Sequence, residues 1–261
     1  MPEHSSWLTF LLAHMRDTLE HNAQALGQSV VGGHEPSWQS FEPIFAAVFI
    51  ALLLILMALR VRSRLRNVDE AIIPEERLTL RTFMEAFLSY FYDLAKSVMG
   101  PERAKKYFPV IGTAALFVFF SNVMALVPGM PVATSSLNIT LGSALVVFLL
   151  FNIYGLMAQG PGYLKHLAGP VWWLAPLLFP LEVLSLCIRP VTLAIRLMVN
   201  MAADHVMLGL FLGMVALFLP IPVMLLGALV VVVQTLVFTL LTCIYIGLAT
   251  EGHDEHAHAA H

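Results

Sequence analysis

Charged residues are scarce in this sequence. Only 12% of its 261 residues are charged, whereas 59% are apolar. A soluble domain averages about 25% charged and about 45–50% apolar residues, so the composition argues against a soluble protein and indicates an integral membrane protein. The apolar segments run about 17 residues or longer without alternating polarity, which predicts spanning helices rather than barrel strands.

Cysteines and catalytic motifs are also rare. The two cysteines, Cys187 and Cys243, both fall in apolar segments, so no disulfide framework is indicated. There is no phosphate-binding loop, nucleophile motif or Cys-x-x-Cys pair, and nothing supports an enzyme or nucleotide site within the chain. The terminal histidines resemble a metal tract, but a solvated tail is the better interpretation: His253, His256, His258 and His261. We therefore expect no cofactor, metal or nucleic-acid partner.

The apolar segments predict about five membrane-embedded helices. Their approximate bounds are 43–59, 107–126, 137–157, 170–219 and 223–249, with a turn at Pro220-Ile221-Pro222 before the last. At 1.5 Å per residue the fourth segment is about twice as long as a bilayer is thick. It forms either two upright spans or one long, strongly tilted helix that Pro180 and Pro190 could kink. The expected architecture is all-α, with two long, tilted helices.

Residues 74–99 have a different, amphipathic pattern. Apolar residues such as Leu80 and Phe83 lie on one side of the helix, and polar residues such as Arg81 and Glu85 on the other. This pattern predicts a helix in the membrane interface, with a small hairpin facing water as the alternative.

Basic residues predict the topology. All of the 14 Lys and Arg except Arg16, Arg189 and Arg196 fall in the loops after the first and third helices. The positive-inside rule places these loops in the cytoplasm. With five crossings, residues 1–42 form an extracytoplasmic segment, residues 43–250 the membrane domain and residues 251–261 a histidine-rich cytoplasmic tail.

A polar stripe runs through the fourth apolar segment. Its members follow at steps of three or four residues and therefore share one helix face: Glu182, Ser185, Arg189, Thr192, Arg196, Asn200 and Asp204. A charge near the bilayer centre costs about 2.5–3.5 kcal/mol, and such residues usually face a bundle interior or a wet cavity. The stripe therefore predicts a functional site.

Arg196 is the most informative residue of the stripe. Arginine keeps its proton under almost any burial. Along a helix, Glu182 lies about 20 Å away and Asp204 about 12 Å, so neither is a good partner. We interpret Arg196 as a functional charge, with a buried ion pair as the alternative. Around it, Thr192 and Glu182 lead toward one end of the helix, and the polar residues after it lead toward the other, which suggests two wet paths.

Two polar residues extend the path toward neighbouring helices. His205 lies nearly opposite Arg196 and can relay protons at physiological pH, or it is a hydrogen-bonded structural residue. Gln234 is the strong polar group of the last helix. It can hydrate the path, contact Arg196 or hold helices together.

The run RPVTLAIRLMVNMAADH at residues 189–205, with Gln234 in VVVVQTLVFTLLTCIYIGLA, resembles subunit a of the rotary F-type ATP synthase. So does LNITLGSALVVFLLF at residues 137–151. The resemblance implies a non-catalytic, proton-translocating stator in the lipid bilayer, with the c-ring and peripheral-stalk subunit b as partners. It also implies a bacterial inner membrane, with the mitochondrial inner membrane as the alternative.

The resemblance assigns roles to individual residues. The family's invariant arginine falls on Arg196, which would face the c-ring carboxylate and separate two offset half-channels. Glu182 would belong to the cytoplasmic path and Asn200, His205 and Gln234 to the outer path, while Thr192 occupies a small-hydroxyl position.

The sequence departs from the family at two positions. An ionisable residue that the family pairs with the His205 position is Gly227 here, and an acid before the third span is Ser136. Asp204 is a candidate for the missing acid. The alternative function is a self-contained secondary transporter that binds an anionic substrate at Arg196. It would predict inverted repeats and helices interrupted in both halves, which the sequence lacks.

Overall fold

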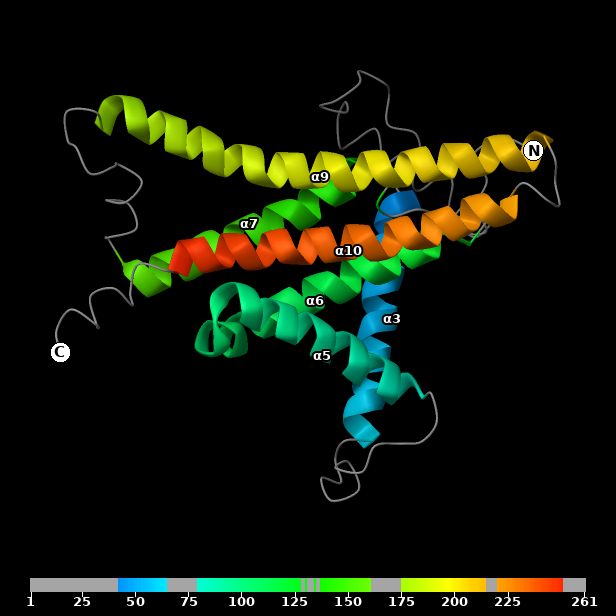
Figure 1. The fold of residues 1–261 in the computed structure, drawn as a ribbon, viewed down its shortest axis with the longest axis horizontal. Coiled ribbons are helices and arrows are strands. Elements are labelled where there is room, and N and C mark those ends of the chain that lie inside the picture. The colour runs from blue at the N-terminus through cyan, green and yellow to red at the C-terminus, as the bar shows by residue number, and fades with distance from the viewer. Residues whose placement is uncertain are drawn as a thin grey trace, which may run out of the picture. The chain divides into compact units, whose positions relative to one another are not determined.

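The computed structural model describes residues 42–64, 79–127, 130, 134, 137–160, 175–214 and 220–250. They form α3 (Glu42–Arg64), α5 (Leu80–Met99), α6 (Pro101–Ala125), α7 (Leu137–Gln159), α9 (Ala175–Met214) and α10 (Pro220–Thr250) (Figure 1). Within these residues, 5 helices, all but α5, are long and apolar enough to cross a membrane. The all-α membrane architecture and the number of embedded helices are thus confirmed, whereas the segments 1–41 and 251–261 lie outside the described residues.

The helix ends differ from the predicted ones where proline is involved. α6 begins at Pro101 rather than near Tyr107, and α10 begins at Pro220. The turn predicted at Pro220-Ile221-Pro222 is therefore wrong. The physical reason is that the first N–H groups of a helix have no acceptor within it, so proline, which lacks an N–H, fits the first turn.

The long fourth apolar segment contains one helix rather than two upright spans. α9 has 40 residues and continues through Pro180 and Pro190, which corresponds to about 60 Å at 1.5 Å per residue. α10 has 31 residues. Both exceed the length of about 20 residues that a bilayer core requires, and their tilt stays a prediction.

The helices divide into two compact units, each described by itself. The first contains α3 to Ala58, α6 from Phe117, α9 from Leu197 and α10 to Val232. In one of its cores, the buried Ala46 and Ile50 of α3 pack with Phe117, Phe120 and Met124 of α6. In the other, Met201 of α9 and Val231 of α10 pack with Phe119, Val123, Ala125, Leu126 and Val230.

The second unit contains the end of α3 from Leu59, all of α5, the first part of α6 and of α9, most of α7 and the second part of α10. Its core consists of buried apolar residues from four helices: Ala95, Met99, Ala104, Tyr107, Ile111, Phe151, Cys243, Ile246 and Ala249. Aromatic contacts hold it together. Tyr107 lies 4.9 Å from Tyr154 between ring centroids, and Phe151 lies 6.0 Å from Tyr245. Such pairs contribute about 0.5–1.5 kcal/mol beyond area burial.

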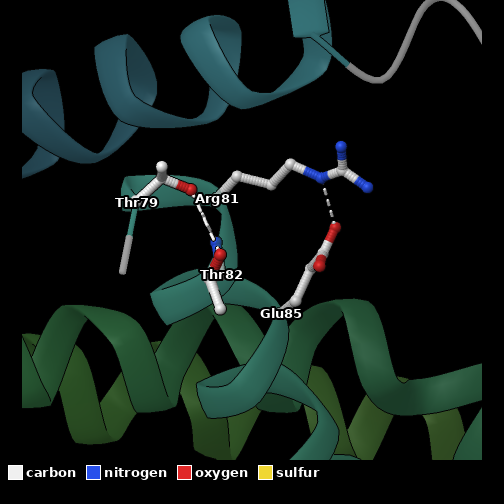
Figure 2. A network of polar contacts seen from close by, with 4 residues as sticks. All are labelled: Thr79, Arg81, Thr82 and Glu85. Atoms are coloured by element: carbon white, nitrogen blue, oxygen red, sulfur yellow. Dashed lines mark hydrogen bonds and ion pairs between the residues drawn. The ribbon is translucent and has the colours of Figure 1, made fainter. Parts of the chain in front are cut away.

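α5 is the amphipathic helix that the sequence predicts, with one correction. It begins at Leu80 after Thr79, an extended N-cap whose side chain accepts a bond from the Thr82 N–H (Figure 2), and residues 74–78 of the predicted range lie outside the described residues. Arg81 was expected on the water-facing side but is buried, with 7% exposed, whereas Leu80 and Phe83 remain 42% and 40% exposed. The helix contacts the core through Met84 and later residues at helical spacing, which turns Arg81 inward.

A single residue joins α5 to α6. Gly100 has φ 83°, a conformation that favours glycine, and its N–H donates to the Lys96 carbonyl at 3.0 Å. The Ala104 N–H in turn donates to the Gly100 carbonyl at 3.0 Å. The chain therefore reverses direction without a loop (Figure 1).

Candidate functional site

Arg196 lies on the outward side of α9. Leu193, Ala194, Leu197 and Met201 are buried, whereas Arg196 is exposed, together with its apolar neighbours Val191, Ile195 and Val199. The structure records no hydrogen bond or ion pair between Arg196 and any other residue that it describes. A permanent positive charge is thus presented by an apolar helix face.

Thr192 shares this exposed face, one turn before Arg196. Its hydroxyl donates to the backbone carbonyls of Ile188, at 3.0 Å, and Arg189, at 2.9 Å. Bonding back to the same helix satisfies a hydroxyl in apolar surroundings. The local structure therefore places a small polar oxygen beside the charged residue, where the sequence pattern predicts it.

Arg189 turns toward α10 in the second unit. Its guanidinium carbon lies 5.3 Å from the centroid of the Tyr245 ring. A cation over an aromatic face contributes about 0.5–1 kcal/mol when exposed and about 2 or more when desolvated. The two arginines of the stripe therefore differ in their surroundings, because Arg189 has an aromatic partner within the chain.

The structure places the other predicted residues as follows. The backbone of Glu182, Asp204 and His205 belongs to α9, but their side chains lie outside the described part. Asn200 is half-buried on the same helix. Gln234, on α10, is buried with 2% exposed. The structure therefore describes four of the seven predicted side chains: Arg196, Thr192, Asn200 and Gln234.

A buried polar cluster in the first unit was missed from the sequence. Ser121, Asn122 and Thr134 are 0%, 0% and 1% exposed. The Thr134 hydroxyl donates to Asn122 Oδ1 at 3.3 Å. Among the described residues, Ser121 Oγ and Asn122 Nδ2 have no hydrogen-bond partner. The signal was available, since Ser121 and Asn122 interrupt the apolar run FVFFSNVMA.

Buried polar atoms rarely stay without partners. Leaving one dry costs about 1–3 kcal/mol, and such groups usually bind an ordered water. An ordered water would therefore give Ser121 Oγ and Asn122 Nδ2 the hydrogen-bond partner that the described residues do not provide. Val123, the residue after Asn122, packs against the Met201–Val231 core.

Comparison with known proteins identifies the family. The family described as "ATP synthase A chain" matches residues 44–247. The chain belongs to the ATP synthase A chain family.

Several relatives support this membership. The chain is similar to ATP synthase subunit a of Sorangium cellulosum, with 56% identity over 98% of this chain and 100% of the relative. It is also similar to ATP synthase subunit a 1 of Syntrophotalea carbinolica, with 43% identity over 78% of this chain and 84% of the relative. A third relative, ATP synthase subunit a of Bdellovibrio bacteriovorus, is 38% identical over 74% of this chain and 84% of its own length.

The match to the ATP synthase A chain family covers every predicted site residue, from Glu182 to Gln234. Because the relatives are bacterial and 5 of the described helices could cross a membrane, the chain is a multi-pass bacterial membrane protein. In this family member, Gly227 is buried on α10, and a Cβ added there would lie 3.8 Å from Leu126 Cδ2. The glycine therefore has space for a first side-chain atom.

Proposed function

We propose that this chain is the ion-translocating stator subunit of the membrane sector of an F-type ATP synthase. In this proposal Arg196 faces a carboxylate of the c-ring and separates two proton half-channels. The chain itself has no catalytic role and conducts protons only against the ring. Family membership and the relatives' names support the complex, and the exposed Arg196 supports the mechanism.

The exposure of Arg196 is the observation on which this proposal depends. A charge at the bilayer centre is costly, and the exposed neighbours Ile195 and Val199 cannot stabilise it. The described residues provide no ion pair for it. The structure therefore favours a partner acid on another chain, and a c-ring carboxylate that passes this face meets the requirement.

The electrostatics of that encounter explain proton release. An opposite charge within about 4–6 Å lowers a carboxylate pKa by about 1–3 units. The ring carboxylate would lose its proton as it approaches Arg196 and remain ionised beside it. Because arginine cannot give up its own proton, it also blocks direct proton transfer from one half-channel to the other.

The two half-channels follow from the polar residues around Arg196. We assign Glu182 and Thr192 to the cytoplasmic path. We assign Asn200, Asp204, His205 and Gln234 to the outer path: its members are all polar and lie beyond Arg196 in α9 or on α10. The buried cluster of Ser121, Asn122 and Thr134 is a further candidate for hydration on the outer path.

The topology belongs to the same proposal. We place residues 1–42 outside the cytoplasm and residues 251–261 inside it, in a bacterial inner membrane. Arg60 and Arg62 are exposed at the end of α3, and Lys105 and Lys106 at the start of α6, which suits a cytoplasmic surface. α5, between these basic ends, would lie in the interface, and subunit b of the peripheral stalk would complete the stator.

Replacing Arg196 tests the proposal. Arg196→Ala is expected to lower ATP synthesis in inverted membrane vesicles by about 10- to 1,000-fold, because the ring carboxylate loses a pKa shift of about 1–3 units. Ile195→Ala, on the same exposed face, is the matched control and should retain synthesis. Assembly is checked by the subunit content of the purified complex. An assembled Arg196→Ala complex that makes ATP at the normal rate would refute the mechanism.

A further inference from the structure

The two arginines of α9 occupy the same side of the helix. Arg189 and Arg196 are the only Lys or Arg residues in its sequence, and their spacing of seven residues corresponds to two turns, or about 10.5 Å. Side chains at this spacing leave the helix in nearly the same direction. Without a further constraint, α9 would therefore present two permanent positive charges on one side.

Only one of these two arginines has a partner among the described residues. Arg196 is exposed and has no recorded hydrogen bond or ion pair there. Arg189 is half-buried, and its guanidinium carbon lies 5.3 Å from the centroid of the Tyr245 ring on α10. A planar guanidinium stacks well on an aromatic face. The Tyr245 ring therefore draws one of the two charges away from the exposed side of α9.

The core of the second unit holds the Tyr245 ring in position. Tyr245 packs against this core, and its ring centroid lies 6.0 Å from that of Phe151, which is 2% exposed. Leu186, three residues before Arg189, packs against the same core. Because the aromatic ring is anchored on its own side, the arginine adjusts to the ring rather than the ring to the arginine.

The stretch of α9 between the two arginines carries no charge. Its exposed members are Val191, Thr192 and Ile195, and the Thr192 hydroxyl donates to the backbone of its own helix. An arginine released from Tyr245 would find no acid among these residues. It would instead have the same access as Arg196 to an acid brought by another chain.

A second exposed arginine would disturb the mechanism proposed above, on which this inference rests. An opposite charge within about 4–6 Å lowers a carboxylate pKa by about 1–3 units. A ring carboxylate that met Arg189 as well as Arg196 would therefore be ionised at two places along α9, and it would leave the second place slowly. Proton uptake and release would no longer be restricted to the two sides of a single charge.

We propose that Tyr245 is a positioning residue that keeps Arg189 away from the rotor, so that Arg196 is the one arginine of α9 that a ring carboxylate meets. Tyr245 acts through the face of its ring and touches no reacting group. Arg189 itself is dispensable for proton transfer, and its contact with Tyr245 also stabilises the packing of α9 on α10.

The test measures ATP synthesis in inverted membrane vesicles and thermal unfolding of the purified complex, whose subunit content confirms assembly. The variants are Tyr245→Leu, Arg189→Gln and the double variant that combines them. Tyr245→Phe is the matched control, because it keeps the ring face. The full complex is used throughout.

Tyr245→Leu should lower ATP synthesis about tenfold, because a carboxylate held by one additional pKa unit is released about tenfold more slowly. Arg189→Gln and Tyr245→Phe should retain synthesis. The double variant should recover the rate of Arg189→Gln, although its unfolding temperature stays lowered because the cation–π contact is still absent. A double variant that does not recover, or an Arg189→Gln loss equal to that of Tyr245→Leu, would assign the contact a purely structural role and overturn the proposal.

Ile188→Arg tests the same inference without altering the core, and it decides the matter if Tyr245→Leu does not assemble. Ile188 is 48% exposed on α9, so an arginine there adds a positive charge to the exposed side. Its ATP synthesis should be about tenfold below that of Ile188→Gln, the uncharged control. Equal rates in these two variants would overturn the proposal. The stator mechanism fails separately, through an assembled Arg196→Ala complex that makes ATP normally.

Discussion

The amide of Asn122 offers a direct test of whether the buried polar cluster holds water. Its Oδ1 accepts a bond from Thr134, and its Nδ2 has no partner among the described residues. The double variant Asn122→Leu/Thr134→Val removes both partners of that bond together, so it creates no new buried polar group. The stability of the double variant and its proton flux are then two independent measures of whether the cluster holds water.

The expected magnitudes distinguish a dry cluster from a wet one. A dry Nδ2 costs about 1–3 kcal/mol, and the Asn122–Thr134 bond contributes about 0.5–1.5 kcal/mol. If the cluster is dry, the double variant gains about 1 kcal/mol and conducts normally. If water satisfies the amide, as we predict, that gain is absent. Proton flux then falls about 5- to 100-fold, because a barrier increase of 1.36 kcal/mol is tenfold in rate.

ATP-driven proton pumping in inverted vesicles measures the flux, and thermal unfolding of the purified complex in detergent measures the stability. Asn152→Leu is the matched control, since Asn152 Nδ2 donates to the Phe148 carbonyl of its own helix at 2.8 Å. This variant should conduct normally. A double variant that is stabilised and pumps at the normal rate would refute the hydrated cluster.

Three further predictions test the site. His205→Ala should slow proton flow and shift its pH dependence, measured as pumping rate against pH; an unchanged profile would assign His205 a structural role. Gly227→Glu should retain more ATP synthesis than Leu226→Glu. A Cβ at Gly227 would lie 3.8 Å from Leu126 Cδ2, an ordinary contact, whereas Leu226 is 62% exposed and a glutamate there would present its charge outward. Equal losses of ATP synthesis would contradict the alignment of Gly227 with the family's ionisable position. Arg189→Gln and Tyr245→Leu should each lower the free energy of unfolding by about 0.5–2 kcal/mol, while Tyr245→Phe retains the ring face and should be nearly neutral in the same assay. An equal loss in Tyr245→Phe would attribute the effect to the hydroxyl.

The sequence predicts the embedded helices well, because the length of an apolar run can be counted without knowing how the helices pack. The ranges 137–157 and 223–249 lie within α7 and α10, and both helices extend only a few residues further. The errors occur at ends, where the outcome depends on backbone hydrogen bonding. Pro220 was placed in a turn, and Pro101 lies before the predicted helix start at 107, yet each occupies the first position of a helix.

The candidate site is predictable only in part, for a physical reason. The spacing of Thr192 and Arg196 places them on one helix face, and both are exposed there. Burial depends on which helix packs where, and periodicity does not specify this. Arg81 was therefore assigned to the wrong side of α5. Asn122 was overlooked, because its contact with Thr134, 12 residues further along the chain, leaves no trace in the periodicity.

Gly100 has a mechanical consequence. A joint of one residue between two helices has no length to stretch, and its two flanking hydrogen bonds resist bending. A Cβ built on Gly247 would lie 3.6 Å from Met99 Cβ, so α10 passes close against this corner. A force on α5 is therefore transmitted to α6, and the two helices move together as one unit.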